Sequence, residues 1–185
     1  MITGPSGVGK GTLIQGLMRA VPELELSVSA TTRAPRLGEV DGRDYHFLSD
    51  REFDRRIAAG DFVEHASYSG HRYGTLRSEL ERRLRAGAPV VLEIEVQGAR
   101  QIRDAMPEAL QVFIAPPTVQ ALRARLVARA TDTPADVEAR LATALEELEA
   151  RPEFSHVIVN DRLEDAIEEL VGIVRMRFPT KGSAP

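Results

Sequence analysis

The sequence predicts an α/β fold in which a parallel β-sheet core is flanked by helices, and two observations predict it. Short runs rich in β-branched residues alternate with longer segments of helical period, as in a parallel sheet covered by helices. A glycine-rich segment at residues 4–12 stands between the first apolar residues and the first amphipathic segment. The chain has 185 residues, a length that suits one domain.

Four segments are predicted to form strands, because each is short, apolar and rich in β-branched residues. They are Leu26–Ala30, Val90–Val96, Leu110–Ala115 and His156–Val159.

Helices are predicted where apolar residues recur every three or four positions. The predicted helices are residues 10–21, 76–85, 118–130, 133–151 and 161–178, followed by a frayed tail at 179–185. We expect Thr75, Thr118, Thr133 and Asp161 to cap helix N-termini, because their short side chains accept hydrogen bonds from free backbone amides.

Residues 33–73 differ in composition from the rest of the chain. They form short segments with glycine-containing turns, interrupted by one helix whose Ser49 and Glu52 have capping-box spacing. We interpret this region as a small inserted lobe.

The composition excludes several classes of protein. With 43% hydrophobic and 28% charged residues, the chain is neither disordered nor fibrous. No apolar run approaches the roughly 20 residues that cross a bilayer, and the N-terminus does not resemble a signal peptide, so we expect a cytoplasmic protein without a membrane partner. The absence of cysteine excludes disulfides and thiolate metal sites, and the net charge of −4 argues against nucleic-acid binding.

The glycine-rich segment has the pattern of a phosphate-binding loop. It consists of Gly4, Pro5, Ser6, Gly7, Val8, Gly9, Lys10, Gly11 and Thr12, and it leads into a helix. Glycines allow successive backbone amides to turn toward an anion, the helix N-terminus adds partial positive charge, and a lysine at this offset reaches the outer phosphates. The alternative is an ordinary glycine-rich turn before a helix, which has no use for the lysine.

Two features of this loop depart from the usual pattern. Gly11 occupies the position whose hydroxyl normally ligates Mg²⁺, so we expect Thr12 to contact phosphate or to hold Mg²⁺ through water. Only three residues precede Gly4, so the first strand is either unusually short or begins upstream of this sequence.

Charged residues near two predicted strand ends indicate a second binding site. Arg33 and Arg36 follow the strand ending at Ala30, where two guanidinium groups suit a second phosphate; a solvated surface pair is the alternative. Glu93 and Glu95 alternate with apolar residues in the predicted strand Val90–Val96 and would share one of its faces. The alternative to a functional acidic pair is that the two carboxylates lie at a strand end that is exposed to solvent.

The motifs of this chain resemble those of guanylate kinases. The segments GPSGVGKGT, SVSATTRAPRLGEVDGRDYHF, DFVEHASYSGHRYGT, VVLEIEVQGAR, FIAPP and VIVND occur in that family's order and approximate spacing, over nearly the whole chain. The resemblance implies a P-loop NTPase fold with a small inserted mixed α/β GMP-binding lobe and a helical lid. It implies one domain at 1–178, with core segments 1–32, 76–118 and 146–178, the lobe at about 33–75 and the lid at about 119–145.

The resemblance also implies roles for individual residues. The GMP-binding set is Ser29, Arg33, Arg36, Tyr45, Glu64, Tyr73, Gly74, Thr75 and Glu95, with Glu64 reading guanine and Arg33, Arg36, Tyr45 and Tyr73 holding the phosphate. The ATP-binding set is the loop Gly4–Thr12 together with Asn160. Lys10, Arg33 and the lid arginines Arg125, Arg129 and Arg140 would be catalytic, and Thr12 and Glu95 would hold Mg²⁺ through water. The family often has aspartate at the position of Glu95, which leaves the contact of this longer side chain open.

The function implied is Mg²⁺-dependent transfer of a phosphoryl group from ATP to GMP, and to dGMP, by a monomer or small homo-oligomer. Three alternatives remain open: a scaffold module that binds phosphopeptide without catalysis, a small-molecule kinase with another acceptor, and a weak enzyme whose first strand is clipped. Lys10 and Glu64, whose loss would mark the scaffold module, are both present.

Overall fold

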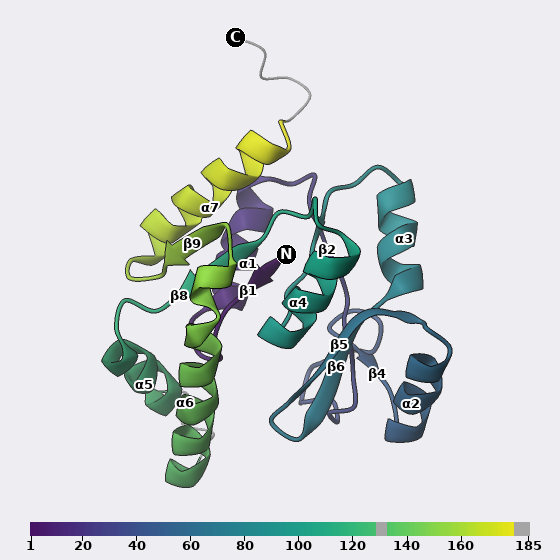
Figure 1. Ribbon diagram of the computed structural model, residues 1–185, viewed down its shortest axis with the longest axis horizontal. Coiled ribbons are helices and arrows are strands. Elements are labelled where there is room, and N and C mark those ends of the chain that lie inside the picture. The colour runs from purple at the N-terminus through teal and green to yellow at the C-terminus, as the bar shows by residue number, and fades with distance from the viewer. Residues whose placement is uncertain (129–132, 180–185) are drawn as a thin grey trace. The chain divides into compact units, whose positions relative to one another are not determined.

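A computed structural model describes residues 1–128 and 133–179 of the chain (Figure 1). The chain forms two compact units. The first contains Met1–Pro22 and the chain from Leu110 on, and the second contains Glu23–Ala109. Within the described residues, no helix combines the length and the apolar character that crossing a membrane requires.

The first unit contains a parallel sheet with the strand order β1-β8-β9. Its strands are β1 (Ile2–Thr3), β8 (Val112–Ala115) and β9 (His156–Val159). All four residues of β8 are buried, as expected for the central strand of a sheet with both faces covered. The parallel pairing confirms the predicted α/β class, and β9 has its predicted bounds.

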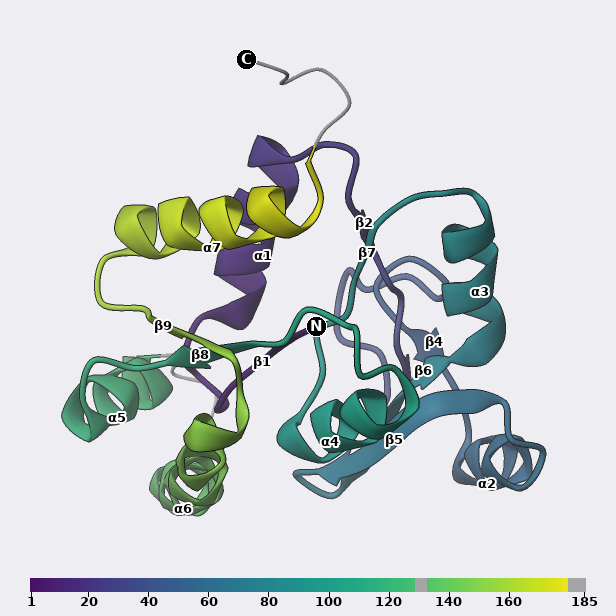
Figure 2. The same ribbon diagram turned by 45° about the horizontal axis from the view of Figure 1, so that its top comes forward.

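Four helices surround this sheet in the described part of the unit. They are α1 (Lys10–Ala20), α5 (Val119–Ala128), α6 (Pro134–Glu149) and α7 (Leu163–Arg177). The apolar positions of α1 that predicted a helix, Leu13 and Leu17, are fully buried. α7 packs against α1, and α5 packs against α6 (Figure 2). The predicted tail lies outside the described residues except for Pro179.

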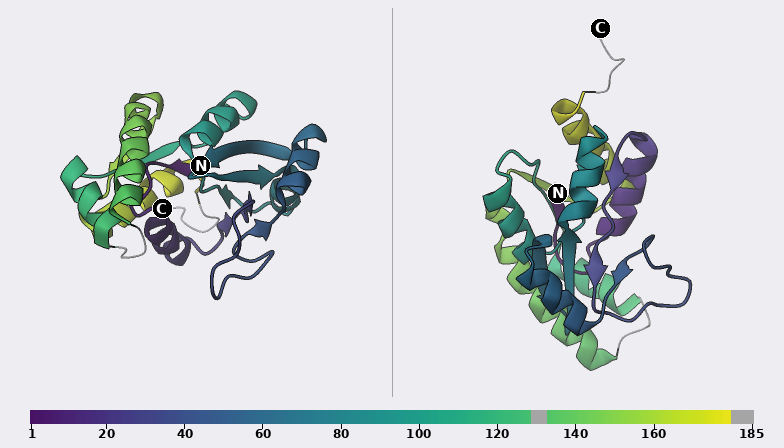
Figure 3. Two further views of the ribbon diagram at one scale, coloured as in Figure 1. Left: turned by 90° about the horizontal axis from the view of Figure 1, so that it is seen from below. Right: turned by 90° about the vertical axis from the view of Figure 1, so that its right-hand side faces the viewer.

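The second unit combines a parallel strand pair with a four-stranded sheet. The pair is β2 (Glu25–Leu26) and β7 (Val90–Val91), and the sheet has the order β4-β3-β6-β5. The strands of the sheet are β3 (Ala30–Thr31), β4 (His46–Phe47), β5 (Phe62–Tyr68) and β6 (His71–Leu76). The antiparallel hairpin β5–β6 runs beside α4 (Val96–Ala105), as Figure 3 shows.

Helices α2 (Asp50–Ala58) and α3 (Arg77–Arg85) complete this unit. Phe53 of α2 and Phe62 of β5 stack with ring centroids 4.5 Å apart, and both belong to a buried cluster with Ala30 and Leu76. The core of the four-stranded sheet therefore forms between α2 and the strands of the region interpreted as a lobe.

Three of the four predicted strands are wrong in extent. The strand predicted at Leu110–Ala115 begins two residues later, at Val112. The predicted strand Leu26–Ala30 is divided, because the chain pairs with β7 through Leu26 and then with β4 and β6 from Ala30. The predicted strand Val90–Val96 ends at Val91, and α4 begins at Val96. The alternation of Glu93 and Glu95 with apolar residues therefore belongs to the connection between β7 and α4 rather than to a strand.

The structure confirms three of the five predicted caps. Ser49 Oγ accepts a hydrogen bond from the amide of Glu52 at 3.2 Å at the start of α2. Thr118 Oγ1 accepts a hydrogen bond from the amide of Ala121 at 3.0 Å, and Thr133 forms a reciprocal capping box with Asp136. Thr75 is not a cap, because it lies in β6 and α3 begins after Leu76. Asp161 is not a cap either, because α7 begins after Arg162.

The capping box predicts an effect on stability. Thr133 Oγ1 accepts from the amide of Asp136 at 3.2 Å, and the Asp136 carboxylate accepts from the amide of Thr133 at 3.0 Å. We expect Thr133→Ala to lower the free energy of unfolding by about 1 kcal/mol, measured by urea denaturation.

Thr143→Ala, in the middle of the same helix, is the matched control. Thr143 is half-buried, and its hydroxyl donates to the carbonyl of Ala139 at 3.2 Å, a bond within the helix that adds little to stability. The higher helix propensity of alanine should therefore leave stability unchanged or raise it by about half a kcal/mol. Equal effects of the two substitutions would contradict the capping role of Thr133.

Candidate functional site

The glycine-rich segment forms a compact loop that ends at the N-terminus of α1. The residue before the helix is Gly9, whose φ of 99° is in the left-handed region. A Cβ atom at Gly9 would lie 2.7 Å from Nδ2 of Asn160, so the loop has room only for glycine here. The first turn of α1 has neither a side-chain cap nor an acidic residue, and its amides are available to an anion.

Lys10 is the cation of this loop. Its side chain is buried, and Nζ donates a hydrogen bond to the carbonyl of Gly4 at 2.6 Å. The ammonium group therefore lies over the loop itself, close to the amides at the start of α1. This arrangement of a cation and helix amides can bind a polyphosphate.

Three predicted residues from distant parts of the chain contact the loop. Asn160 Nδ2 donates to the carbonyl of Val8 at 2.8 Å, and Arg125 donates to the carbonyls of Val8 at 3.2 Å and Asn160 at 2.8 Å. Arg140 donates to Oγ of Ser6 at 2.8 Å. The structure thus brings two lid arginines and Asn160 to the phosphate loop, whereas Arg129 lies outside the described residues.

The residues predicted to hold Mg²⁺ fit a metal held mainly by a nucleotide. Thr12 is exposed in the first turn of α1, and Oε2 of Glu95 is buried without a hydrogen-bond partner among the described residues. Across residues 1–128 and 133–179, no three histidine or carboxylate side chains gather into a metal site. In the described part of the chain, Thr12 and Glu95 thus each offer single oxygen ligands, which suit an ion that keeps most of its water and binds with phosphates.

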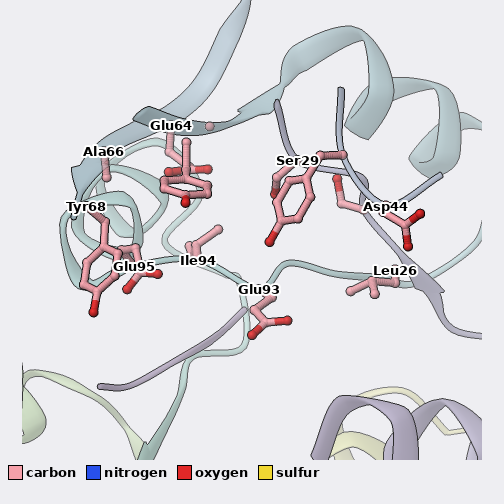
Figure 4. Close-up of a pocket in the computed structure, with 13 residues that line it drawn as sticks. Leu26, Ser29, Asp44, Glu64, Ala66, Tyr68, Glu93, Ile94 and Glu95 are labelled. Carbon is pink, nitrogen blue, oxygen red and sulfur yellow. The ribbon is translucent and has the colours of Figure 1, made fainter. Parts of the chain in front are cut away.

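The second unit contains a pocket of about 200 Å³ next to the β5–β6 hairpin (Figure 4). Six predicted residues line it, namely Ser29, Tyr45, Glu64, Tyr73, Gly74 and Glu95. Leu26, Ser29 and Asp44 lie toward one side of the pocket, and Ala66, Tyr68 and Glu95 lie toward the other. The predicted residues Arg33, Arg36 and Thr75 do not line this pocket.

Glu64 is the buried acid of the pocket. Its side chain is on β5, only 3% of the residue is exposed, and Oε1 accepts a hydrogen bond from Oγ1 of Thr75 at 2.7 Å. The pKa of Glu64 is raised to about 7, chiefly by burial; the hydrogen bonds from Thr75 oppose this shift, and the nearby charge of Glu95 adds to it. A carboxylate held this way can accept two hydrogen bonds from a ligand that supplies adjacent N–H donors.

The predicted phosphate ligands lie in a network around Glu39. The Arg33 guanidinium forms an ion pair with Glu39 at 2.8 Å and lies 5.4 Å from the centre of the Tyr45 ring. The hydrogen bond from Arg33 holds the pKa of Glu39 below its usual value, and the amide of Arg36 also donates to Glu39 at 2.6 Å. The Arg36 residue is exposed.

The two tyrosines pack edge to face, with ring centroids 6.2 Å apart. Burial raises the pKa of the Tyr45 phenol, as does the nearby charge of Glu93, so the phenol stays protonated and can donate. Tyr45 and Tyr73 both line the pocket that contains Glu64, so one cavity offers phenol donors and a carboxylate acceptor.

Sequence reasoning missed several residues of this site. Tyr68 and Ser27 line the pocket, and the Tyr68 OH and the Ser27 Oγ are buried without partners among the described residues. Glu64, Ala66 and Tyr68 alternate along β5 and all line the pocket, so the period of two from Glu64 was an available signal for Tyr68. No pattern in the sequence indicated that Glu39 would pair with Arg33.

Comparisons with known proteins show which family this chain is similar to. A family model described as guanylate kinase matches residues 1–177. A guanylate kinase of Rubrobacter xylanophilus is 52% identical over 175 residues, covering 95% of this chain and 92% of that protein. A guanylate kinase of Streptomyces coelicolor is 49% identical over 176 residues, covering 95% of this chain and 89% of that protein.

Two solved structures are similar to this chain in fold. A crystal structure of guanylate kinase from Anaplasma phagocytophilum has a TM-score of 0.77 and 32% sequence identity, covering 97% of this chain and 85% of that chain. A gluconokinase from Sinorhizobium meliloti, at 20% identity, shares the fold with a TM-score of 0.53, covering 95% of this chain and 91% of that chain. The predicted P-loop kinase fold is therefore confirmed.

The raised pKa of Glu64 predicts a pH-dependent effect of Glu64→Gln on stability. Because folding favours the protonated acid, this contribution to stability is fully present below the unfolded pKa of 4.5 and is lost as the pH rises through about 7. Glutamine cannot ionise, so the variant should exceed the parent in unfolding free energy by up to about 3 kcal/mol at pH 8. At pH 5 the difference should fall to about 1 kcal/mol or less.

Urea denaturation at pH 5, 6, 7 and 8 measures this difference. Glu168→Gln, at an exposed position of α7, controls for the substitution itself. A difference between Glu64→Gln and the parent that is the same at pH 5 and pH 8 would show that Glu64 does not titrate in this range.

Proposed function

Since the chain belongs to the guanylate kinase family and is an ATP:GMP phosphotransferase, we propose that the pocket around Glu64 binds GMP and that the loop Gly4–Thr12 binds ATP. The observation that most supports this assignment is the buried Glu64 carboxylate in a pocket with phenol and hydroxyl donors. The predicted division into core, lobe at about 33–75 and lid at about 119–145 remains part of this proposal. The relatives compared with this chain are catalytic kinases, so the scaffold alternative has no support.

The chemistry of Glu64 suits guanine. The Watson–Crick edge of guanine presents N1–H and the 2-amino group as adjacent donors, and a carboxylate accepts from both. Adenine has an acceptor at N1 and lacks the 2-amino group, so it would leave a buried charge unpaired, which costs a large share of the binding energy. Ser29 and Thr75 add hydroxyl groups on the side of the base that carries O6, although Thr75 already donates to Glu64.

The GMP phosphate would be held by Arg33, Arg36, Tyr45 and Tyr73. Two guanidinium groups and two protonated phenols match the charge and the acceptors of a phosphate dianion. Arg33 is paired with Glu39, so the phosphate would have to replace the Glu39 carboxylate as the acceptor of hydrogen bonds from the guanidinium group. Gly74 and Glu95 complete the pocket wall in this assignment.

Transfer requires an oxygen of the GMP phosphate to attack the γ-phosphorus of ATP in line. The new P–O bond forms as the bond to the β-phosphate oxygen breaks, giving GDP and ADP. Lys10, Arg33, Arg125 and Arg140 would neutralise the charge on the transferring group, and Arg129 joins them in this proposal. The protein contributes position and electrostatics, and no covalent intermediate is needed.

Mg²⁺ would accompany ATP, with Thr12 and Glu95 holding it through water. When bound, the ion would supply positive charge that neutralises the phosphates. We also propose that dGMP is accepted, that the enzyme works in the cytoplasm in purine nucleotide metabolism, and that it is a monomer or small homo-oligomer without nucleic-acid or membrane partners.

An acceptor panel tests the role of Glu64. With ATP and Mg²⁺, turnover should be confined to guanine nucleotides, and GMP should exceed IMP, which lacks the 2-amino group, by at least about 100-fold in kcat/KM. Glu64→Gln offers one acceptor and one donor, so kcat/KM for GMP should fall about 100-fold and the GMP preference over IMP should fall below about tenfold. A coupled assay of ADP release measures both.

The KM for ATP is the internal control, because Glu64 is assigned to the other nucleotide. A Glu64→Gln enzyme that keeps its full preference for GMP over IMP would contradict the assignment of Glu64 to the base.

Lys10→Met tests the assignment of the loop. Methionine keeps much of the length of the side chain but removes the charge, so kcat should fall by about 10²–10³-fold while the KM for GMP changes by less than about threefold. The same coupled assay gives both values, and a thermal melt within a few degrees of the parent excludes misfolding. If the variant keeps a kcat above one third of the parent value, Lys10 does not have the proposed catalytic role.

A further inference from the structure

Gly98 lies in the first turn of α4, directly against the Glu64 side chain. α4 packs along β5, the strand that contains Glu64 (Figure 3). A Cβ atom built at Gly98 would lie 2.0 Å from Oε2 of Glu64 and 2.8 Å from its Cδ. These separations are far below van der Waals contact, so the carboxylate occupies the space that any side chain at this position would need.

The Glu64 carboxylate is therefore confined on two sides. Oε1 accepts the hydrogen bond from Thr75 at 2.7 Å, and Oε2 lies against the backbone of Gly98. Glu64 therefore lies beside the N-terminal turn of α4, whose N-cap residue is Glu95. The glycine brings the carboxylate close to this helix end.

We propose that Gly98 is a positioning residue for base recognition, because the absence of a side chain there sets where the Glu64 carboxylate meets guanine. This inference rests on the proposed role of Glu64. It assigns specificity to a residue that does not line the pocket and that touches the base only through Glu64.

The geometry predicts which side chain would move if Gly98 were replaced by a larger residue. The atoms nearest to a Cβ at Gly98 all belong to the end of the Glu64 side chain, and none belongs to backbone. A methyl group can therefore be accommodated by rotation of Glu64 away from Thr75 and α4. Base recognition should suffer while the fold remains.

The test compares Gly98→Ala with Gly172→Ala. Both glycines lie in helices, but a Cβ at Gly172 meets nothing within 4 Å. Gly98→Ala should raise the KM for GMP at least about tenfold and reduce the preference for GMP over IMP by a similar factor, with the KM for ATP unchanged. Gly172→Ala should leave all three values unchanged.

A second comparison separates positioning from a loss of structure. Glu64→Asp is shorter by one methylene, so its carboxylate is withdrawn from Gly98, and adding Gly98→Ala to it should change the KM for GMP by less than about threefold. If Gly98→Ala lowers the melting temperature, the double variant Gly98→Ala with Glu64→Ala should melt at the same temperature as Glu64→Ala alone, because the side chain that clashes is gone. A lower melting temperature of the double variant would place the clash elsewhere and overturn the proposal.

A crystal structure of Gly98→Ala separates the role of Gly98 from that of Glu64. A broken Thr75–Glu64 hydrogen bond together with the kinetic change supports the proposal. An unmoved carboxylate, or a KM for GMP within threefold of the parent, overturns it even if Glu64→Gln impairs recognition. If Glu64→Gln itself leaves the GMP preference intact, the assignment of Glu64 fails, and the proposal for Gly98 fails with it.

Discussion

The burial of the Glu64 carboxylate is the constraint on which the second unit depends. A carboxyl group with 3% exposure costs free energy to bury unless it has a hydrogen-bond partner. Thr75 supplies the hydrogen bond, and the β5–β6 pairing places the two residues opposite each other. This pairing also explains why Thr75 does not cap α3. Its hydroxyl is committed to Glu64, so the helix begins two residues later without a side-chain cap.

The first unit is organised around the backbone of the glycine-rich loop. The carbonyl of Val8 accepts hydrogen bonds from Asn160 and from Arg125, and Ser6 accepts from Arg140. Residues that follow the last strand, and residues on α5 and α6, thus meet at one short loop. The two units differ in the charge that they present. In the first unit, cationic and amide donors gather at the loop, whereas in the second unit the acidic side chain of Glu64 lines the pocket.

The sequence was most informative where a local pattern has one physical cause. The strand His156–Val159, the helix after the loop, and the caps Thr118 and Thr133 follow from apolar period and from side chains that satisfy free amides. The pocket residues Glu64, Tyr45 and Tyr73 were found through motifs of the family. The helix α4 was missed because the alternation before it favours a strand and Gly98 disfavours a helix. The pairing of Arg33 with Glu39 and the contact of Gly98 with Glu64 depend on how separate segments meet in space, which no local pattern encodes.

The hydrogen bond from Asn160 to Val8 joins residues 152 positions apart in the chain. Because synthesis runs from the N-terminus, the loop leaves the ribosome well before Asn160, which donates to its backbone. The strand beside it has the same dependence, because β1 pairs with β8, which begins at Val112. A nascent chain therefore contains the glycine-rich sequence long before it can contain the folded loop. A ribosome-bound fragment that ends before Asn160 therefore lacks one of the hydrogen bonds that shape the loop.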